Sequence, residues 1–336
     1  MMVVPRYRDL LTQTLAGETA PICPVFAHCH HPIADQDAEA LAAATLAWQA
    51  RFDLDLVKLT PASTWQLRDY GVEDAHDPSD ALGRRRIVRT VVKDPDDWYR
   101  LAPLAPGDGF TARIVQAGDR LRRRLPPTIP LLATLYSPVS LAAKLAPPGT
   151  LARHRTEAPE AVAAGLTTLT DNCRRLVSAL TDVGVDGIFL AVQSAQASLV
   201  TSDDYARLGL SGDLACLVAA SALPFNVLHL HGDKVHHHLF RDAPAALIHY
   251  NMSPGNPLPT DFQPQPGLST GPDPDGVITH GTVRQCVDEV RRILDRFAGP
   301  GFVLAPGCSL PLAVSVENLD AMIALARTPH QQYPFS

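Results

Sequence analysis

Residues 227–232, with the sequence VLHLHG, form an apolar stretch that ends in two histidines and a glycine. Successive side chains of a β-strand point to opposite faces, so His229 and His231 share one face and Leu228 and Leu230 the other. A second apolar stretch, residues 301–308 (GFVLAPGC), delivers Cys308 just after its carboxyl end. We therefore expect two buried strands whose carboxyl ends carry residues that bind metals.

The rest of the chain repeats this pattern of a short apolar stretch followed by a helical one. The expected strands are residues 22–27, 54–59, 129–135, 187–192, 225–231, 246–250, 268–270 and 301–305. Long helical patterns at 35–52, 157–183 and 282–297 alternate with them, and Ser202 is expected to cap another helix. Eight strands alternating with helices predict an α/β fold of the (β/α)8 TIM-barrel type.

An open doubly wound sheet is the alternative fold. No Gly-x-Gly-x-x-Gly follows the first strand, which weakens a dinucleotide-binding interpretation. Residues 64–109 are polar and predict an insertion after the second strand, and whether it acts as a lid stays open. We expect a single domain over residues 1–336.

Composition narrows the function classes. The 336 residues are 46% hydrophobic and 19% charged, with a net charge of −6, so a sizeable core is expected and nucleic-acid binding is not. No apolar run is long enough for a membrane span. Arg6, Arg8 and Asp9 stand where a signal peptide would need its apolar core, so we expect a cytoplasmic protein. The six cysteines are scattered, which argues against disulfides.

In a barrel, functional groups lie at the carboxyl ends of the strands. Two imidazoles and one thiolate are a normal ligand set for catalytic zinc, with a fourth position left open. His229, His231 and Cys308 come from different strands and can converge, so they are the predicted metal ligands and catalytic residues. In the alternative interpretation, the two histidines are polar residues of a pocket that bind no metal, and Cys308 packs at the start of a helix.

Other polar residues follow strands as well. His28 opens the run of residues 28–31 (HCHH), which is either a competing metal cluster or a loop that contacts substrate. Tyr136 is either a substrate hydrogen-bond partner or an aromatic at the barrel mouth, and Ser194 either orients a substrate or enters a helix. Asn251 follows the strand after the two histidines. We expect His28, Tyr136, Ser194 and Asn251 to line the substrate pocket.

Residues 304–311 (LAPGCSLP) and 317–322 (ENLDAM) resemble the C-terminal signature of the uroporphyrinogen decarboxylase superfamily. They look most like its zinc-dependent corrinoid methyltransferases, and residues 6–17, 134–144 and 186–205 agree, with the family's substrate-contacting serine falling on Ser194. The resemblance implies a (β/α)8 barrel. In that branch a His-x-Cys pair and a later cysteine bind zinc, and the matching positions are His229, His231 and Cys308.

Two departures from the family pattern bear on chemistry. The decarboxylases carry an arginine-rich loop after the first strand and a catalytic aspartate after the second, where this chain has residues 26–31 (FAHCHH) and 59–63 (LTPAS). We therefore expect little positive charge for a substrate with several carboxylates. The other departure is His231, which stands where the methyltransferases have cysteine. Zinc with two thiolates is formally neutral, whereas zinc with one is +1 and holds a substrate thiolate more firmly but leaves it less nucleophilic.

These features predict a zinc-dependent enzyme that moves a methyl group between a corrinoid and a small thiol. The corrinoid, a cobalamin-type cofactor, would be the methyl carrier and would sit on a partner protein. The alternatives are decarboxylation of the parent type and a metal- or corrinoid-binding protein without turnover. A homodimer is left open.

Overall fold

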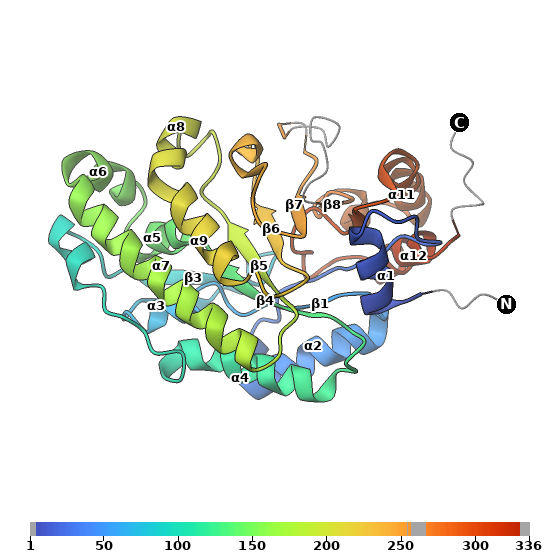
Figure 1. Ribbon diagram of the computed structural model, residues 1–336, viewed down its shortest axis with the longest axis horizontal. Helices are drawn as coiled ribbons and strands as arrows, with labels where there is room; N and C mark the ends of the chain where they lie inside the picture. Colours follow the sequence, from blue (N-terminus) through green and yellow to red (C-terminus); the bar gives the residue numbers. More distant parts are fainter. Residues whose placement is uncertain (1–4, 254, 257–266, 330–336) are drawn as a thin grey trace.

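The computed structural model describes residues 5–253, 255–256 and 267–329. A curled parallel sheet lies at its centre, with helices around the outside (Figure 1). The strands follow one another in the order β1 (Val57–Leu59), β4 (Leu131–Tyr136), β5 (Gly187–Val192), β6 (Val227–Leu230), β7 (Leu247–Tyr250), β8 (Gly267–Thr270) and β9 (Phe302–Leu304). Every neighbouring pair in this order is parallel, as expected of a TIM-barrel sheet.

The eighth position is taken by residues 22–27, which were predicted as a regular strand but form only an isolated bridge, between Val25 and Leu304. Pro24 has no N–H to donate to a ladder, which limits regular pairing here. The segment still bonds to both edges of the sheet. The Phe26 N–H donates to the Leu304 carbonyl at 3.1 Å, and the Asp55 N–H donates to the Val25 carbonyl at 2.9 Å. The barrel is thereby closed between β9 and β1, which confirms the predicted fold class.

The helices alternate with the strands along the chain. The longer ones are α1 (Tyr7–Leu15), α2 (Ala38–Phe52), α4 (Gly109–Arg124), α5 (Pro138–Leu145), α6 (Thr150–Glu157), α7 (Pro159–Asp182), α9 (Ser211–Ala219), α11 (Val283–Phe297) and α12 (Val316–Ala326). The shorter ones are α3 (Trp65–Arg68), α8 (Ser202–Tyr205) and α10 (Val277–His280). Among the described residues, no helix has the length and apolarity needed to cross a bilayer.

The expected helix at 157–183 is confirmed as α7, which begins two residues later because Pro159 starts it and the residue before a proline avoids helical angles. The cap predicted for the next helix was wrong by one residue. The expected cap Ser202 is instead the first helical residue of α8. Thr201 caps this helix by accepting the Asp204 N–H.

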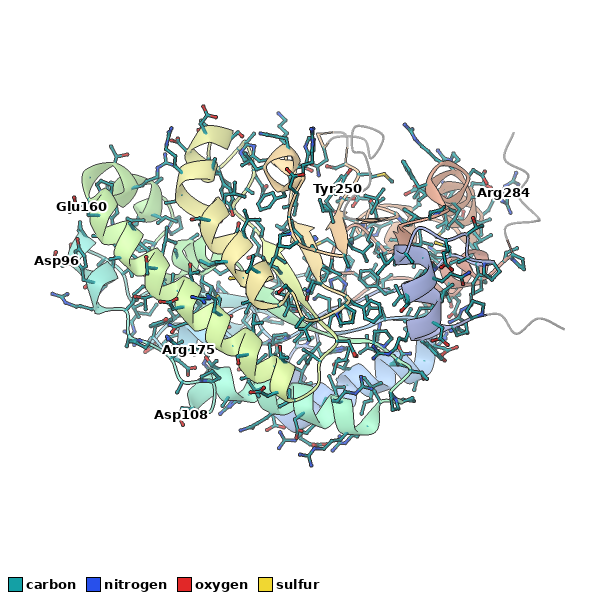
Figure 2. The ribbon with its side chains drawn as sticks, in the orientation of Figure 1. Asp96, Asp108, Glu160, Arg175, Tyr250 and Arg284 are labelled. Carbon is teal, nitrogen blue, oxygen red and sulfur yellow. The ribbon has the colours of Figure 1, made fainter. Side chains whose placement is uncertain are left out.

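Helix α11 illustrates why these segments fold as they do. Thr282 and Gln285 form a capping box at its start, which satisfies backbone N–H groups that the helix leaves unpaired. Cys286, Val290 and Leu294 recur at helical spacing and are buried. Arg284 of this helix lies on the outside of the molecule, whereas Tyr250 lies inside at the end of β7 (Figure 2).

The core has an outer and an inner part. The outer part fills the space between strands and helices. The inner part lies within the barrel and includes Leu56, Leu132, Val227, Leu247 and Val303. Toward the carboxyl ends of the strands this apolar filling gives way to polar side chains, and that change in polarity positions the functional site.

The predicted insertion after the second strand is confirmed, and it contains the antiparallel hairpin of β2 (Glu73–His76) and β3 (Arg85–Arg89). The hairpin loop lies against the loop that follows Cys308, since the Leu312 N–H donates to the Ala81 carbonyl at 2.8 Å. A Cβ added at Gly83 would lie 3.0 Å from side-chain atoms of both Leu312 and Pro32. The insertion therefore reaches the carboxyl-end rim of the barrel.

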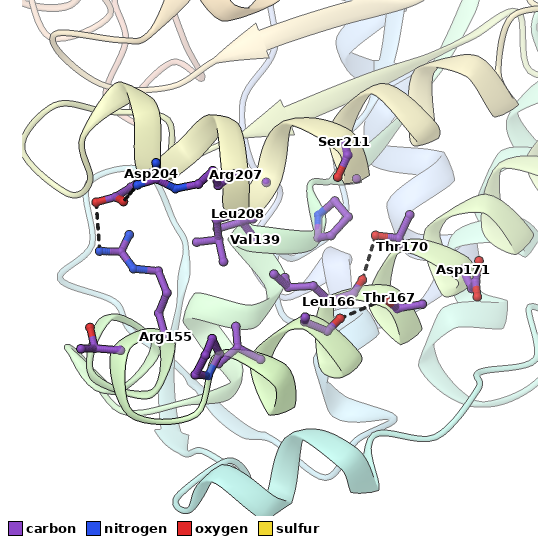
Figure 3. Close-up of a pocket in the computed structure, with 17 residues that line it drawn as sticks. Val139, Arg155, Leu166, Thr167, Thr170, Asp171, Asp204, Arg207, Leu208 and Ser211 are labelled. Atoms are coloured by element: carbon purple, nitrogen blue, oxygen red, sulfur yellow. Dashed lines mark hydrogen bonds and ion pairs between the residues drawn. The ribbon is translucent and has the colours of Figure 1, made fainter.

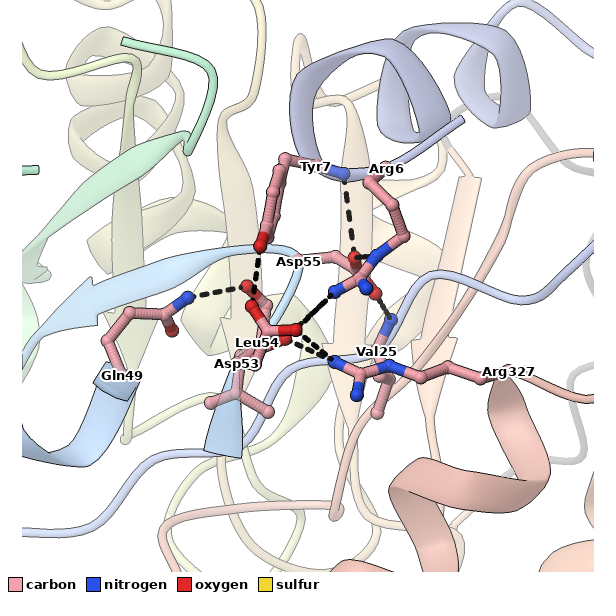
Figure 4. A network of polar contacts seen from close by, with 8 residues as sticks. All are labelled: Arg6, Tyr7, Val25, Gln49, Asp53, Leu54, Asp55 and Arg327. Carbon is pink, nitrogen blue, oxygen red and sulfur yellow. Dashed lines mark hydrogen bonds and ion pairs between the residues drawn. The ribbon is translucent and has the colours of Figure 1, made fainter. Parts of the chain in front are cut away.

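The opposite rim carries a network of ion pairs (Figure 4). Asp55 is fully buried and accepts from the Arg6 guanidinium at 2.9 Å and from the Val25 N–H at 3.1 Å. Asp53 pairs with Arg6 and with Arg327 at the end of α12. The network joins the N-terminal segment, the eighth position of the barrel and the last helix.

Substitution Asp55→Asn should lower the free energy of unfolding by about 3 kcal/mol. It removes the negative charge that pairs with the Arg6 guanidinium and weakens the hydrogen bond from the Val25 N–H. Urea denaturation followed by circular dichroism measures this free energy. The control is Asp320→Asn, which removes an ion pair with Arg51 in which both side chains are about half exposed. The control should change the same free energy by less than about 1 kcal/mol. Equal effects of the two substitutions would contradict the role assigned to Asp55.

Candidate metal centre

Three predicted ligands converge at the carboxyl-end rim of the barrel. The ligand atoms of His229, His231 and Cys308 all lie within 4.8 Å of one another. The Cys308 Sγ atom is 3.6 Å from His229 Nε2 and 3.4 Å from His231 Nδ1. His229 lies in β6 and His231 directly follows it, while Cys308 lies in the loop after β9. The period of two along β6 places both imidazoles on the inward face, as predicted.

The hydrogen bonds of His229 leave one ring nitrogen available as a ligand. Its Nδ1 atom lies 3.2 Å from the backbone oxygen of His249. A carbonyl oxygen only accepts, so Nδ1 carries the proton and Nε2 presents its lone pair toward Cys308. Metal-binding histidines are usually oriented in this way by a partner on the second nitrogen.

Burial sets the protonation of the three residues. It holds the pKa of His229 well below the usual range and also lowers the pKa of His231, so both rings are neutral at neutral pH. Neutral imidazole is the form that binds metals. Burial raises the pKa of the Cys308 thiol. A metal ion would overcome this, because coordination deprotonates a thiol outright.

The donor set fits a zinc ion. Two imidazole nitrogens and one sulfur are among the ligands that zinc prefers, and three protein ligands leave one position of a tetrahedral site for substrate. Among the described residues, this is the only group of three or more His, Cys, Asp or Glu residues close enough to share a metal ion. The run at residues 28–31 does not form a cluster of this kind.

A buried lysine lies close to the centre, and sequence reasoning missed it. Lys58 of β1 is 7% exposed, and its Nζ atom lies 3.1 Å from Thr60 Oγ1 and 4.5 Å from the centre of the Phe189 ring. No ion pair joins it to any residue that the structure describes. Burial lowers the pKa of Lys58 to about 7. The alternation of Leu56 and Lys58 along β1 was the signal that could have revealed an inward lysine.

A cavity of about 500 Å³ opens beside the three ligands. It is lined by His30, Ser63, Thr64, Asp77, Asp80, Arg84, Arg85, Arg86, Ile87, Tyr136, Lys144, Gln193, Gln196 and His231. His231 thus joins the ligand cluster to the cavity wall, and β2–β3 supplies much of the opposite wall. A volume of this size suits a small-molecule substrate.

The cavity is richer in positive charge than the sequence suggested. The cations Arg84, Arg85 and Arg86 come from the inserted hairpin and not from the loop after the first strand, so the expectation of little positive charge was wrong. Arg84 pairs with Asp80 at 2.8 Å. Lys144 has no ion pair with the described residues, and its Nζ atom lies 4.5 Å from the centre of the Tyr136 ring. Burial lowers the pKa of Lys144 to about 7.

The predicted substrate residues are distributed unevenly. Tyr136 lines the cavity, and Ser194 lies beside the cavity residue Gln193 just after β5. His28 lies within the barrel, its ring 5.5 Å from that of Phe189. Asn251 donates to Asp273 at 3.2 Å and packs against Gly307. His28, Ser194 and Asn251 are not among the residues that line the cavity, and the substrate roles of all four residues remain predictions.

A larger cavity, of about 660 Å³, lies on the outer flank of the barrel between α5, α7 and α9 (Figure 3). Its walls include Val139, Leu166 and Leu208, and one end carries the ion pairs of Asp204 with Arg155 and Arg207. It contains none of the three candidate ligands. We therefore place the chemistry at the smaller cavity, where convergent donors and charged groups meet.

Comparisons with solved structures agree with the barrel. A methyltransferase from Methanosarcina mazei superposes with a TM-score of 0.80 at 17% sequence identity, over 95% of this chain and 97% of that one. A putative vitamin-B12-independent methionine synthase from Listeria monocytogenes gives a TM-score of 0.57 at 11% identity, over 99% of each chain. A B12-independent methionine synthase from Shewanella sp. W3-18-1 gives 0.55 at 12% identity, over 86% of each chain. At these identities the likeness establishes the fold.

Two comparisons of sequence, with a curated protein and with a family model, bear on the family of this chain. The sulfur carrier protein FdhD of Chromobacterium violaceum is 32% identical over 139 residues, which are 41% of this chain and 45% of that protein, so this match spans less than half of either. The model of the uroporphyrinogen decarboxylase (URO-D) family matches residues 23–329, a region that contains all three candidate ligands and every strand of the barrel. The chain therefore belongs to the uroporphyrinogen decarboxylase family.

Proposed function

We propose that this protein is a zinc-dependent methyltransferase that moves a methyl group between a corrinoid, carried by a partner protein, and a small thiol. The observation that carries the proposal is the convergence of His229, His231 and Cys308 within 4.8 Å at the rim of the barrel. The methyltransferase from Methanosarcina mazei supports it as a structural neighbour.

The bound zinc would accept the substrate thiol as a thiolate, which makes the thiol reactive at neutral pH. The protein would contribute two neutral imidazoles and one sulfur ligand, from the buried His229 and the partly buried His231 and Cys308. With a single thiolate among its ligands, the site has a formal charge of +1 before substrate binds. This charge favours firm binding of a thiolate and slows its attack, so the proposal includes a slow and tightly binding acceptor.

The cavity points to the chemistry of the rest of the acceptor. Lys144 lacks an acidic partner among the described residues, and both Lys144 and Arg84 line the cavity that His231 borders. An oxyanion on the acceptor would supply the missing counter-charge, since a charge-assisted hydrogen bond is stronger than a neutral one. We infer a thiol with a carboxylate, sulfonate or phosphate group.

Decarboxylation is the second candidate, and the cations of the cavity favour it as well. Arg84 and Arg85 are paired with Asp80 and Asp74, but Arg86 and Lys144 have no ion pair with the described residues and could hold carboxylates of such a substrate even without an arginine-rich loop after the first strand. The stretch after β1, where the family's decarboxylases place an aspartate, has Thr60 and Pro61. This weakens the second candidate.

The purified protein should contain stoichiometric zinc, and the variants His231→Ala and Cys308→Ala should lose it. Loss of a residue that only hydrogen-bonds to a metal ligand typically lowers metal affinity about 10–100-fold. Removal of a ligand itself should lower the zinc affinity by more than that. Elemental analysis after dialysis against a weak chelator measures the metal. The control is Cys173→Ala, a buried cysteine of α7 that should keep its zinc. Stoichiometric zinc in both ligand variants would contradict the assignment.

The zinc-loaded protein should demethylate a methylcorrinoid, and 3-mercaptopropionate should be a better acceptor than 2-mercaptoethanol. Lys144→Met should raise KM for the charged thiol by about tenfold or more, which corresponds to the loss of a hydrogen bond to a charged group, and should leave KM for the uncharged thiol unchanged. Corrin absorbance follows the reaction. Release of carbon dioxide from uroporphyrinogen, without methylation of any thiol, would support the second candidate instead.

A further inference from the structure

We propose that His249, which is not one of the metal ligands, is the positioning residue that couples the Cys308 loop to His229. The proposal rests on the metal centre proposed above. Its basis is a pair of hydrogen bonds by which one residue of β7 contacts both ligand-bearing segments.

His249 occupies the right place for this role. β7 lies between β6 and β8, and His249 is in register with His229 on one side and Ser269 on the other. Because the register places it level with His229, its side chain also points into the barrel. The residue is completely buried, and its ring centre lies 4.8 Å from that of His229.

The backbone and the side chain of His249 act on different ligands. Its carbonyl oxygen accepts from His229 Nδ1 at 3.2 Å, which fixes the tautomer and the rotation of that ring. Its own Nε2 atom lies 2.9 Å from the carbonyl oxygen of Pro306, and must donate to it. Pro306 precedes Cys308 by two residues. His249 therefore links the two segments directly, through one hydrogen bond on each side.

The rings of Phe26 and Phe189 restrict His249 to this orientation. The centre of each lies 5.6 Å from the centre of the imidazole. Side chains held in a close-packed interior rarely change rotamer, so Nε2 stays directed at Pro306. A displacement of the β7 backbone would move the partners of both ligands together.

The Cys308 loop is also held by contacts that do not involve His249. Its fold therefore does not depend on His249 alone. The N–H groups of Ala305 and Gly307 donate to the carbonyls of Thr270 and Pro272 at 3.1 Å each. At Gly307 an added Cβ would lie 2.5 Å from both Cα and Oδ1 of Asn251, so the loop packs directly on the residue after β7. Loss of the His249 side chain should therefore leave the fold intact while freeing Cys308 to shift relative to His229.

The test measures cobalt(II) binding by the absorption of the cobalt–thiolate bond, which reports coordination by Cys308. His249→Phe keeps the ring volume and removes the donor, and it should bind cobalt about 10–100-fold more weakly than the unaltered protein. His249→Gln retains an N–H donor and should recover part of the affinity. The matched control is His154→Phe, which removes another buried histidine, one that accepts from Trp98 at 3.1 Å in a remote helix. It should bind cobalt normally.

A second readout needs no metal. Of the six cysteines, Cys308 alone is partly exposed and the other five are buried, so we expect iodoacetamide to label Cys308 preferentially in the metal-free protein. His249→Phe should change this labelling rate severalfold, and His154→Phe should not. Normal cobalt affinity and normal labelling in His249→Phe would overturn the proposal. If the unaltered protein binds no metal, the proposed function fails, and the labelling rates still decide whether His249 positions the loop.

Discussion

The curvature of the parallel sheet is the constraint on which the centre depends. His229 lies in β6 and Cys308 follows β9, two strands that are separated by β7 and β8, so a flat sheet would hold the two residues well apart. Closure by residues 22–27, which bond to β9 on one side and to the start of β1 on the other, bends the sheet until these strand ends face each other across one rim. The convergence of the three candidate ligands therefore depends on the closure of the barrel. Asp55 contributes from the opposite rim by holding the closing segment.

Burial, more than pairing with opposite charges, determines the protonation states of the histidines and lysines at this rim. Desolvation by burial lowers the pKa of His229 and of His231, which favours the neutral imidazole that binds metals. Burial lowers the pKa values of Lys58 and Lys144 to about 7, and neither amine has an acidic partner among the described residues that would favour its charged form. Such an arrangement stabilises anions that enter from outside. It agrees with a substrate that binds as a thiolate and carries a second negative group.

The sequence was sufficient to predict the barrel and the convergence of His229, His231 and Cys308. Alternation along residues 227–231 put both histidines on one face, and the stretch that ends at Cys308 supplied the third donor. The sequence was not sufficient to predict features that depend on contacts between residues far apart in the chain. The Arg84–Arg86 run is plain in the sequence, yet only the folding of the hairpin over the rim brings it to the cavity. His249 read as an ordinary strand residue, because its role depends on hydrogen bonds to β6 and to the loop after β9.

X-ray absorption at the zinc edge, before and after addition of 3-mercaptopropionate, tests the central claim most directly. The account predicts two nitrogen neighbours and one sulfur neighbour from protein, the sulfur at about 2.3 Å, and a second sulfur at a similar distance once the thiol is added. A sulfur count that does not change on addition of the thiol would contradict the claim that this centre activates a thiol acceptor.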